Sequence, residues 1–425
     1  MPGQGIKKTI MVESLPINIE DGQSYYISQK SPNTLTHVFF KYPCRFIPEI
    51  PRWALKRYVG DNKNAIVFDP FSGSGTTLLE SIINGYSSCG TEIDEIAKLL
   101  IKVKTTPLTQ EELDYTKMYF EKIIIKISDD KVLISRPHIS NLEHWFSEEA
   151  ITILGRLLTL IDKARYENVI DFMKICLISV IKKVSYADDI SPKPYVSTKI
   201  IKQPPNALNE FKAVFNKYFA AICEMSNSGI TKTAKILEGD ALNFKIDNRA
   251  DLAITSPPYI NAFDYARVMR LENLWLGALT EDELKSRKKK YVGTEQVSVL
   301  NEEKDLSILN ESSLLKKVFD EVYLVDKKRA IIIKKFFDDM KGNLQCVYNN
   351  LNDNCCYMIV IGNSKIRSVE IESWKILLEI ANNIGYIKDV HFSYVIQNPY
   401  IRIPRGNKGG KISSDQVLVL KKVVK

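Results

Sequence analysis

Two short motifs that lie far apart in the chain each follow a short apolar run. Residues 69–77 (DPFSGSGTT) come after the run at 65–68 and precede a helical pattern, whereas residues 255–259 (TSPPY) come after the run at 252–254. Loops at the carboxyl ends of parallel strands are where open α/β sheets bind their ligands. We therefore expect both motifs to lie at one edge of such a sheet.

Strand-like and helix-like segments alternate around the first motif. The sequence predicts a strand at 65–69, a helix at 76–84, a second strand at 87–92 and a helix from about 94 to 104. This order is typical of an α/β fold with a doubly wound parallel sheet. The same pattern returns later, with expected strands at 234–240, 251–256, 355–362, 386–396 and 416–422 and expected helices at 326–351 and 369–384.

Two regions interrupt this alternation. Between 105 and 231 the pattern is helical, apart from a proline-containing segment at 185–205 that we expect to be a loop. A smaller region without a strand pattern covers about 277–320. We expect the catalytic domain to consist of 32–104 and 232–425, with 105–231 as a helical insertion and candidate DNA-recognition region. The first thirty residues are irregular in pattern and are given no role.

Composition excludes some classes of protein. The 59 Lys and Arg residues exceed the 51 Asp and Glu residues by a net charge of +8, a mild excess that permits a polyanionic partner without requiring one. No apolar run is long enough to cross a bilayer and the start has no signal-peptide core, so we expect a cytoplasmic protein. The seven cysteines form no CxxC pair and the four histidines no HExxH motif, so we expect reduced thiols and no catalytic metal.

The glycine-containing motif can hold a small ligand at the start of a helix. Gly73 and Gly75 allow a tight turn and a close approach of the backbone to a ligand. The helix that begins at Thr76 directs its positive end toward a ligand carboxylate, and Asp69 can accept from a ligand ammonium group. A generic glycine turn and a phosphate loop are the alternatives, although the GxxxxGK[ST] pattern is absent.

Two further carboxylates follow strand-like runs. Glu92, in GTEID, comes about twenty residues after the glycine loop, where a ribose diol is commonly bound. Asp94 is the alternative for this role, although a carboxylate there can instead cap the next helix. Asp240, in EGDA, can accept from an adenine amino group or simply form a turn.

The second motif suits chemistry on an exocyclic aromatic amine, whose delocalised lone pair makes it a poor nucleophile. The Ser256 hydroxyl and nearby backbone carbonyls can accept the two amine hydrogens as the nitrogen pyramidalises. Pro257 and Pro258 fix the loop and have no N–H to compete for those acceptors. Tyr259 offers a flat face for a base rotated out of a duplex. For PPY alone, a proline turn with a buried tyrosine is the alternative.

Taken together, these motifs resemble those of the site-specific DNA amino-methyltransferases of the bacterial restriction–modification or orphan type. FDPFSGSGTT, GTEID, EGDA and TSPPY match the cofactor, ribose, adenine and catalytic motifs of that family in a compatible order. The resemblance covers about 36–422 apart from the helical insertion. It implies a Rossmann-like methyltransferase sheet, S-adenosylmethionine as cofactor, double-stranded DNA as substrate and a separately encoded restriction endonuclease as a candidate partner.

The resemblance also assigns residues and a target base. The segment 37–53 resembles the family's amino-terminal segment that packs over the methionine end of the cofactor. SPPY accompanies mostly cytosine N4 methylation in this family, whereas Asp or Asn at its first position accompanies adenine N6 methylation, so Ser256 favours cytosine. The expected catalytic residues are Ser256, Pro257, Pro258 and Tyr259. The expected cofactor-binding residues are Tyr42, Phe46, Asp69, Phe71, Gly73, Gly75, Thr76, Glu92 and Asp240.

Other classes of methyltransferase and nuclease would carry different sequence features. Pro43–Cys44 resembles the dipeptide of enzymes that methylate cytosine carbon 5, but it precedes the glycine loop instead of following it, so we expect Cys44 to be a packing residue. An RNA methyltransferase would usually carry an RNA-binding module, and a non-catalytic subunit would have a degraded loop; neither feature is present. No PD…(D/E)xK pattern stands out, so cleavage would need a separate protein.

Residues that contact DNA are harder to identify. The basic run at 285–290 (KSRKKK) can bind phosphates or form a solvated helix face. A second candidate group consists of Arg402, Arg405, Lys408 and Lys411. Base readout is expected in either 105–231 or 277–320.

Overall fold

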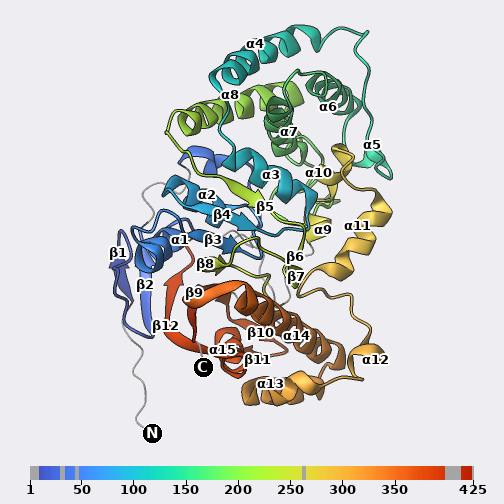
Figure 1. Cartoon of the computed structure of the whole chain (residues 1–425). Coiled ribbons are helices and arrows are strands. Elements are labelled where there is room, and N and C mark those ends of the chain that lie inside the picture. The colour runs from blue at the N-terminus through green and yellow to red at the C-terminus, as the bar shows by residue number, and fades with distance from the viewer. Residues whose placement is uncertain (1–8, 29–33, 44–46, 261–264, 398–412, 424–425) are drawn as a thin grey trace.

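A nine-stranded sheet forms the centre of the computed structural model, which describes residues 9–28, 34–43, 47–260, 265–397 and 413–423 (Figure 1). In spatial order the strands are β1 (Ile10–Val12), β2 (Gln23–Ile27), β12 (Tyr386–Val395), β13 (Ser414–Lys422), β9 (Leu351–Gly362), β8 (Ala250–Thr255), β3 (Ile66–Asp69), β4 (Ser87–Gly90) and β5 (Ala234–Ile236). Every pairing in this sheet is parallel except those of β13, which runs antiparallel to both β9 and β12. This is a Rossmann-like, doubly wound α/β fold.

The order of winding reverses between two central strands. From β3 the chain moves outward through β4 to β5, and it then returns to β8 on the other side of β3. β3 and β8 pair directly, with Val67 opposite Leu252 and Phe68 opposite Ala253. In open α/β sheets, a reversal of this kind leaves a crevice at the carboxyl ends of the strands. Both sequence motifs follow these two strands.

The central strands are apolar on both faces because helices cover both. Val67 belongs to the cluster that includes Trp53, whereas the next residue, Phe68, packs in the cluster on the opposite face. Figure 1 shows α1 (Glu49–Ala54), α2 (Thr76–Ile83) and α3 (Glu95–Thr105) on one side and α14 (Lys327–Asn350) and α15 (Ser373–Ile384) on the other.

A group of helices follows α3 in the chain and lies beyond it at the top of Figure 1. It consists of α4 (Gln110–Lys126), α5 (Leu142–Trp145), α6 (Glu148–Ile161), α7 (Glu167–Ile181) and α8 (Ala207–Ser226). Thr109 caps α4 in a capping box with Glu112, and Ser147 caps α6. The described residues between 106 and 231 add no strand to the central sheet. The domain boundaries at 104/105 and 231/232 remain a proposal.

Several elements differ from the sequence expectations. β1 and β2, within the first thirty residues, extend the sheet beside β12. The expected strand at 234–240 divides into β5 and the two-residue β6 (Gly239–Asp240), which forms a hairpin with β7 (Asn243–Phe244). The expected helix at 369–384 begins only at Ser373, because residues 369–371 form β11, which pairs with β10 (Ser364–Ile366).

The region 277–320 contains α11 (Glu281–Arg287), the 3₁₀ turn η3 (Lys288–Lys290), α12 (Val299–Glu302) and most of α13 (Ser313–Tyr323). Among the described residues, no helix is long and apolar enough to span a membrane. Within the same residues, no group of three or more His, Cys, Asp or Glu side chains is suited to hold a metal ion.

Candidate active site

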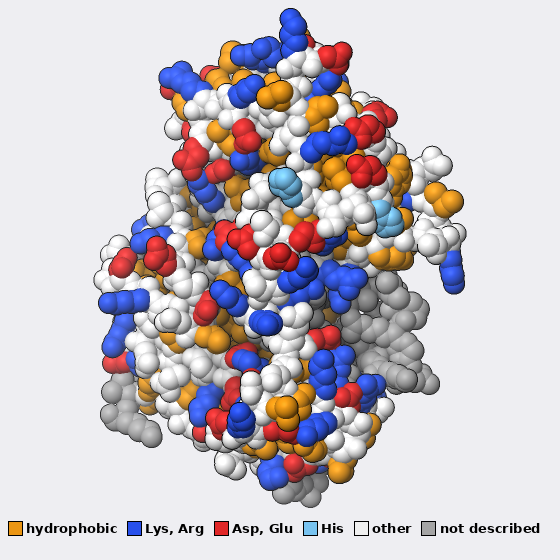
Figure 2. All heavy atoms as spheres, turned by 90° about the vertical axis from the view of Figure 1, so that its right-hand side faces the viewer, with side chains coloured by type: hydrophobic (Ala, Val, Ile, Leu, Met, Phe, Trp, Pro, Cys, Tyr) orange, Lys and Arg blue, Asp and Glu red, His pale blue; other side chains and the backbone are white. Residues whose placement is uncertain are grey.

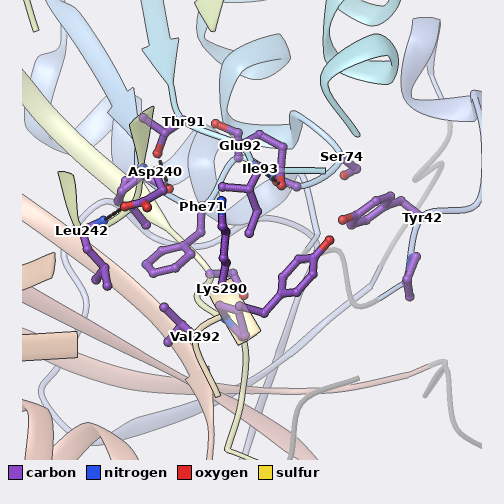
Figure 3. Close-up of a pocket in the computed structure, with 18 of the residues that line it drawn as sticks. Tyr42, Phe71, Ser74, Thr91, Glu92, Ile93, Asp240, Leu242, Lys290 and Val292 are labelled. Carbon is purple, nitrogen blue, oxygen red and sulfur yellow. Dashed lines mark hydrogen bonds between the residues drawn. The ribbon is translucent and has the colours of Figure 1, made fainter. Parts of the chain in front are cut away.

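A cleft opens where β3, β4 and β8 end (Figure 3). Its empty space, including the part open to solvent, is about 810 Å³. It is lined by Tyr42, Pro43, Pro70, Phe71, Ser72, Gly73, Ser74, Thr76, Thr91, Glu92, Ile93, Asp240, Ala241, Leu242, Ser256, Pro258, Lys290, Tyr291 and Val292. The fold therefore brings residues from both sequence motifs into one cleft.

The glycine loop adopts a conformation that other residues rarely allow. Gly73 and Gly75 have φ values of +49° and +73°, and α2 begins immediately after Gly75. A Cβ at Gly75 would lie 2.9 Å from Ile101 Cγ1 of α3, so this glycine is needed for helix packing. The buried Lys104 ammonium group donates to the Ser74 carbonyl oxygen at 2.6 Å and supports the loop from behind.

The Glu92 carboxylate joins the glycine loop to the end of β4. Its Oε2 accepts from the Gly73 N–H at 2.8 Å, and its Oε1 accepts from the N–H groups of Ile93 and Asp94 at 2.7 and 2.9 Å. Burial raises the pKa of Glu92 to about 7, although these three N–H groups oppose the shift. Asp94 instead caps α3, accepting from the Ala97 N–H at 2.9 Å.

Asp69 links the two motifs directly. Its Oδ1 accepts from the Thr255 hydroxyl at 2.7 Å and from the Phe71 N–H at 3.0 Å. The Phe71 N–H also lies 3.2 Å from Thr255 Oγ1. Burial raises the pKa of Asp69 to about 6. These bonds hold the carboxyl ends of β3 and β8 together.

Asp240 lies on the opposite wall of the cleft from the glycine loop (Figure 3). Its Oδ1 accepts from the N–H groups of Leu242 and Asn243 at 2.9 and 3.0 Å, which stabilises the β6–β7 turn. For its Oδ2 no hydrogen bond is found among the described residues, so this oxygen can accept from a ligand.

The catalytic motif leaves β8 and enters the same cleft. Ser256 and Pro258 line it, and Pro257 is buried between them. Tyr259 is partly buried, and its hydroxyl donates to Asp415 Oδ1 of β13 at 2.6 Å. The polar end of Tyr259 is therefore fixed by a strand that comes much later in the chain.

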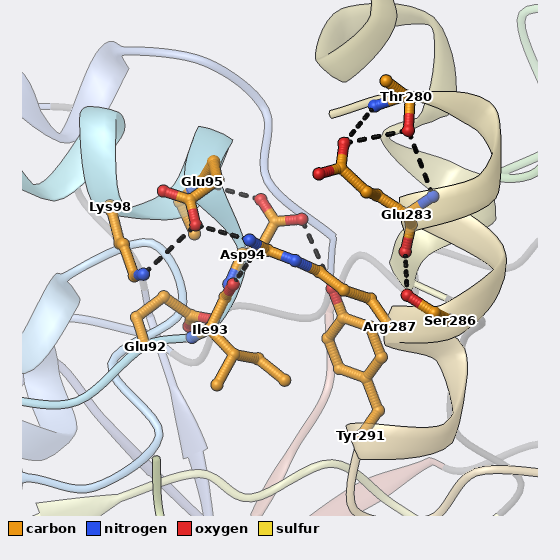
Figure 4. Close-up of polar contacts among 11 residues, drawn as sticks. Glu92, Ile93, Asp94, Glu95, Lys98, Thr280, Glu283, Ser286, Arg287 and Tyr291 are labelled. Atoms are coloured by element: carbon orange, nitrogen blue, oxygen red, sulfur yellow. Dashed lines mark hydrogen bonds and ion pairs between the residues drawn. The ribbon is translucent and has the colours of Figure 1, made fainter. Parts of the chain in front are cut away.

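The region 277–320 contributes a segment to the wall of the cleft. The sequence did not predict this contribution. Lys290, Tyr291 and Val292 line the cleft, and Figure 3 shows Lys290 beside Phe71. The Arg287 guanidinium donates to the Ile93 carbonyl oxygen and pairs with Glu95 at 2.7 Å (Figure 4). The Tyr291 hydroxyl lies 3.4 Å from Asp94 Oδ2. We call residues 287–292 the strap.

Not every predicted residue lies in the cleft. Asp69 and Gly75 are not among the lining residues, so their direct contact with a cofactor stays a prediction, while the structure shows them joining loops and packing helices. Phe46, Cys44 and the basic residues Arg402, Arg405, Lys408 and Lys411 lie outside the described residues. Thr255, Lys104 and Asp415 were missed because their partners are distant in sequence.

Comparisons with known proteins agree with the fold and the motifs. The sequence model of a family described as DNA methylase matches residues 21–102. Type II methyltransferase M.MvaI of Kocuria varians is 24% identical over 451 residues, which cover 97% of each chain. Type II methyltransferase M.BsoBI of Geobacillus stearothermophilus is 28% identical over 61% of this chain and 55% of the relative. Type II methyltransferase M.MjaII of Methanocaldococcus jannaschii is 23% identical over 73% of this chain and 77% of the relative.

The match to the DNA methylase family includes the glycine loop and Glu92, and the first of these relatives aligns over nearly the whole chain. These matches support a DNA amino-methyltransferase of the restriction–modification type, a class that acts on cytosine N4 or adenine N6.

Proposed function

We propose that this protein transfers a methyl group from S-adenosylmethionine to the N4 amine of cytosine in duplex DNA. The observation that carries the proposal is the joining of the glycine loop to the SPPY loop through Asp69 and Thr255. This bond holds the cleft and the SPPY loop together at one edge of the sheet. A methyl donor and its acceptor need that proximity.

The residues of the cleft fit this cofactor. The start of α2, at Thr76, offers a positive helix end to the cofactor carboxylate. Glu92 is suited to accept from the ribose hydroxyls, and the open Oδ2 of Asp240 to accept from the adenine amine. Tyr42 and Phe71 offer apolar faces to the methionine and adenosine portions. When bound, the cofactor supplies an electrophilic methyl group on a sulfonium sulfur.

The SPPY loop would prepare the amine. The Ser256 hydroxyl and the backbone carbonyls near Pro257 accept the two N4 hydrogens, which concentrates the lone pair on nitrogen. The new N–C bond forms as the methyl–sulfur bond breaks, and the sulfur keeps that electron pair. The methylated nitrogen becomes cationic and then releases a proton to water, so no cysteine nucleophile or histidine base is required. Ser256 at the first motif position favours cytosine over adenine.

Duplex DNA is the proposed macromolecular partner. Figure 2 shows Lys and Arg side chains gathered midway down one face, at the level of α11 in Figure 1. Lys285 and Lys289 in this part of the chain are exposed. Exposed cations of this kind bind phosphates without reading sequence. We further propose that a separately encoded endonuclease shares the recognition site, since the relatives are named as Type II methyltransferases.

Truncation of the stacking residue tests this mechanism. Tyr259→Ala should lower the rate of methyl transfer from labelled cofactor to duplex DNA by ~10- to 100-fold, because base–aromatic stacking contributes ~1–3 kcal/mol. Its affinity for the cofactor, measured by calorimetry, should stay within about twofold, since Tyr259 does not line the cofactor cleft.

Cys44→Ser is the matched control and should keep most of its activity. Loss of all activity in Cys44→Ser, together with covalent trapping on 5-fluorocytosine DNA, would instead indicate a thiolate mechanism. Full activity in Tyr259→Ala would contradict the proposed role of the SPPY loop.

A further inference from the structure

A buried carboxylate lies behind the SPPY loop and binds two tyrosine hydroxyls. Asp415 Oδ1 accepts from Tyr259 at 2.6 Å, and Asp415 Oδ2 accepts from Tyr394 at 2.8 Å. Asp415 is 6% exposed and Tyr394 is 2% exposed. Each carboxylate oxygen therefore accepts one short hydrogen bond from a phenol.

The sheet fixes the position of this carboxylate. Asp415 lies in β13 opposite Tyr394 of β12 on one side and opposite Gly362 of β9 on the other. Because β13 is paired on both sides, Asp415 has little freedom to move along the sheet. Tyr259, by contrast, lies on the loop that follows β8. Its hydroxyl thus joins a loop residue to a rigid central strand.

Because Asp415 is buried, the loss of either hydrogen bond to its carboxylate would be unfavourable. Burial raises the pKa of Asp415, and the two phenol donors oppose that rise. A buried carboxylate without hydrogen bonds is costly, whereas hydrogen bonds to a charged acceptor are among the stronger ones in proteins. Rotation of the Tyr259 ring away from this position would break one such bond. The orientation of the ring is therefore held before any base arrives.

We propose that Asp415 is a positioning residue for methyl transfer, which holds the Tyr259 ring in the orientation that receives the flipped base, while Tyr394 holds Asp415 in turn. This inference rests on the proposed function. Asp415 itself does not need to touch the DNA or the cofactor. Its effect is to restrict the ring, and through the ring the base, to the reactive geometry.

Variants that keep the aromatic ring test this role. Tyr259→Phe retains the stacking face and loses only the hydroxyl that Asp415 holds. Asp415→Asn retains the size of the side chain but replaces one acceptor oxygen with a donor, and Asp415→Ala removes both acceptors. Tyr386→Phe is the matched control, because Tyr386 is a buried tyrosine of β12 whose hydroxyl donates to the Leu344 carbonyl oxygen at 3.1 Å, away from the site.

The kinetic expectation is a loss in kcat with little change in KM. Methyl transfer by Tyr259→Phe and Asp415→Ala should fall by ~10- to 100-fold in kcat, because small misplacements of reacting groups have effects of this size. The loss in Asp415→Asn should be smaller than in Asp415→Ala, since its amide oxygen still accepts one hydroxyl. Cofactor affinity and the KM for DNA should change less than about threefold, and Tyr386→Phe should match the wild type.

A spectroscopic readout separates positioning from loss of stability. Sequencing of modified DNA would first locate the methylated position, and a duplex would then be made with 2-aminopurine at that position. When 2-aminopurine stacks on Tyr259, its fluorescence lifetime is short. This short-lifetime component should weaken in Tyr259→Phe and Asp415→Ala and persist in Tyr386→Phe. If the Asp415 variants fail to fold, Tyr259→Phe decides the question alone.

The possible outcomes are distinct. Wild-type kcat and an unchanged short lifetime in folded Tyr259→Phe would overturn the positioning role while leaving the proposed function intact. A wild-type protein that methylates neither cytosine nor adenine would overturn both proposals. A selective loss of kcat and of the short lifetime in these variants supports the role of Asp415.

Discussion

Buried polar side chains around the cleft join segments that are distant in sequence. Asp69 binds Thr255, Lys104 binds the Ser74 carbonyl oxygen and Asp415 binds Tyr259. A buried polar group without partners is costly, so each of these contacts restrains the loops that it joins. The positions of Asp69 and Glu92 after strand-like runs predicted that both lie at the carboxyl edge of the sheet, while their direct contact with a cofactor stays a prediction. Lys104 and Asp415 were not, because no local pattern shows which distant residue a buried side chain will meet.

If Glu92 binds the cofactor as proposed, we expect the affinity for the cofactor to depend on pH. Burial raises the pKa of Glu92 to about 7, so the protonated form predominates below that pH and the ionised form above it. Only the ionised form offers full acceptor capacity to a ribose diol. Cofactor affinity should therefore increase by up to ~10-fold as the pH rises from about 6 to about 8, as the ionised fraction does for such a pKa.

Calorimetry of the wild type and of Glu92→Gln across this pH range checks the expectation. Glu92→Gln should bind the cofactor more weakly than the wild type, and its affinity should not show this increase with pH. Any remaining dependence of its affinity on pH reports the cofactor's own amine, which titrates near ~8. Equal slopes in the two proteins would show that another group controls binding.

The strap is an element whose place at the cleft has no signal in the sequence. Its region was predicted to lack strands and to be one of two candidate regions for base readout, and the basic run at 285–290 was interpreted as either a phosphate-binding group or a solvated helix face. In the structure Arg287 holds the strap against the end of β4, with Lys290 and Tyr291 at the cleft. β1 and β2 were missed for a different reason. β1 has three residues, and the first inward-facing residue of β2 is the polar Gln23.

Removal of the strap's anchor should weaken cofactor binding. Arg287→Ala loses a partly buried ion pair and the bond to the Ile93 carbonyl oxygen, and a loss of ~1 kcal/mol corresponds to ~5-fold weaker affinity. Lys289→Ala is the matched control, because Lys289 is exposed and does not line the cleft.

A comparison of the two dissociation constants for S-adenosylmethionine is the measurement. We expect weaker binding in Arg287→Ala and unchanged binding in Lys289→Ala. The same weakening in both variants would indicate a general charge effect, and none in either would remove the strap from the cofactor site.

At the scale of the whole molecule, the sheet explains why two distant motifs form one site. The alternation of strands and helices predicted the fold class and most of the central strands. It did not predict that β13 would lie antiparallel between β9 and β12, since strand order depends on pairings between segments far apart in the chain. That arrangement places Asp415 behind the SPPY loop. The helices at 110–226 lie outside the sheet, and their proposed role in DNA recognition remains to be tested.

The most direct measurement of the central claim is the identity of the methylated nucleoside. Duplex DNA from a methylation-deficient host would be incubated with the protein and S-adenosylmethionine carrying a deuterated methyl group, then digested to nucleosides and analysed by mass spectrometry. The account predicts deuterated N4-methylcytosine, which is lost when Tyr259 is replaced by alanine. Deuterated N6-methyladenine as the sole product would contradict the choice of base, and 5-methylcytosine would contradict direct transfer to the exocyclic amine.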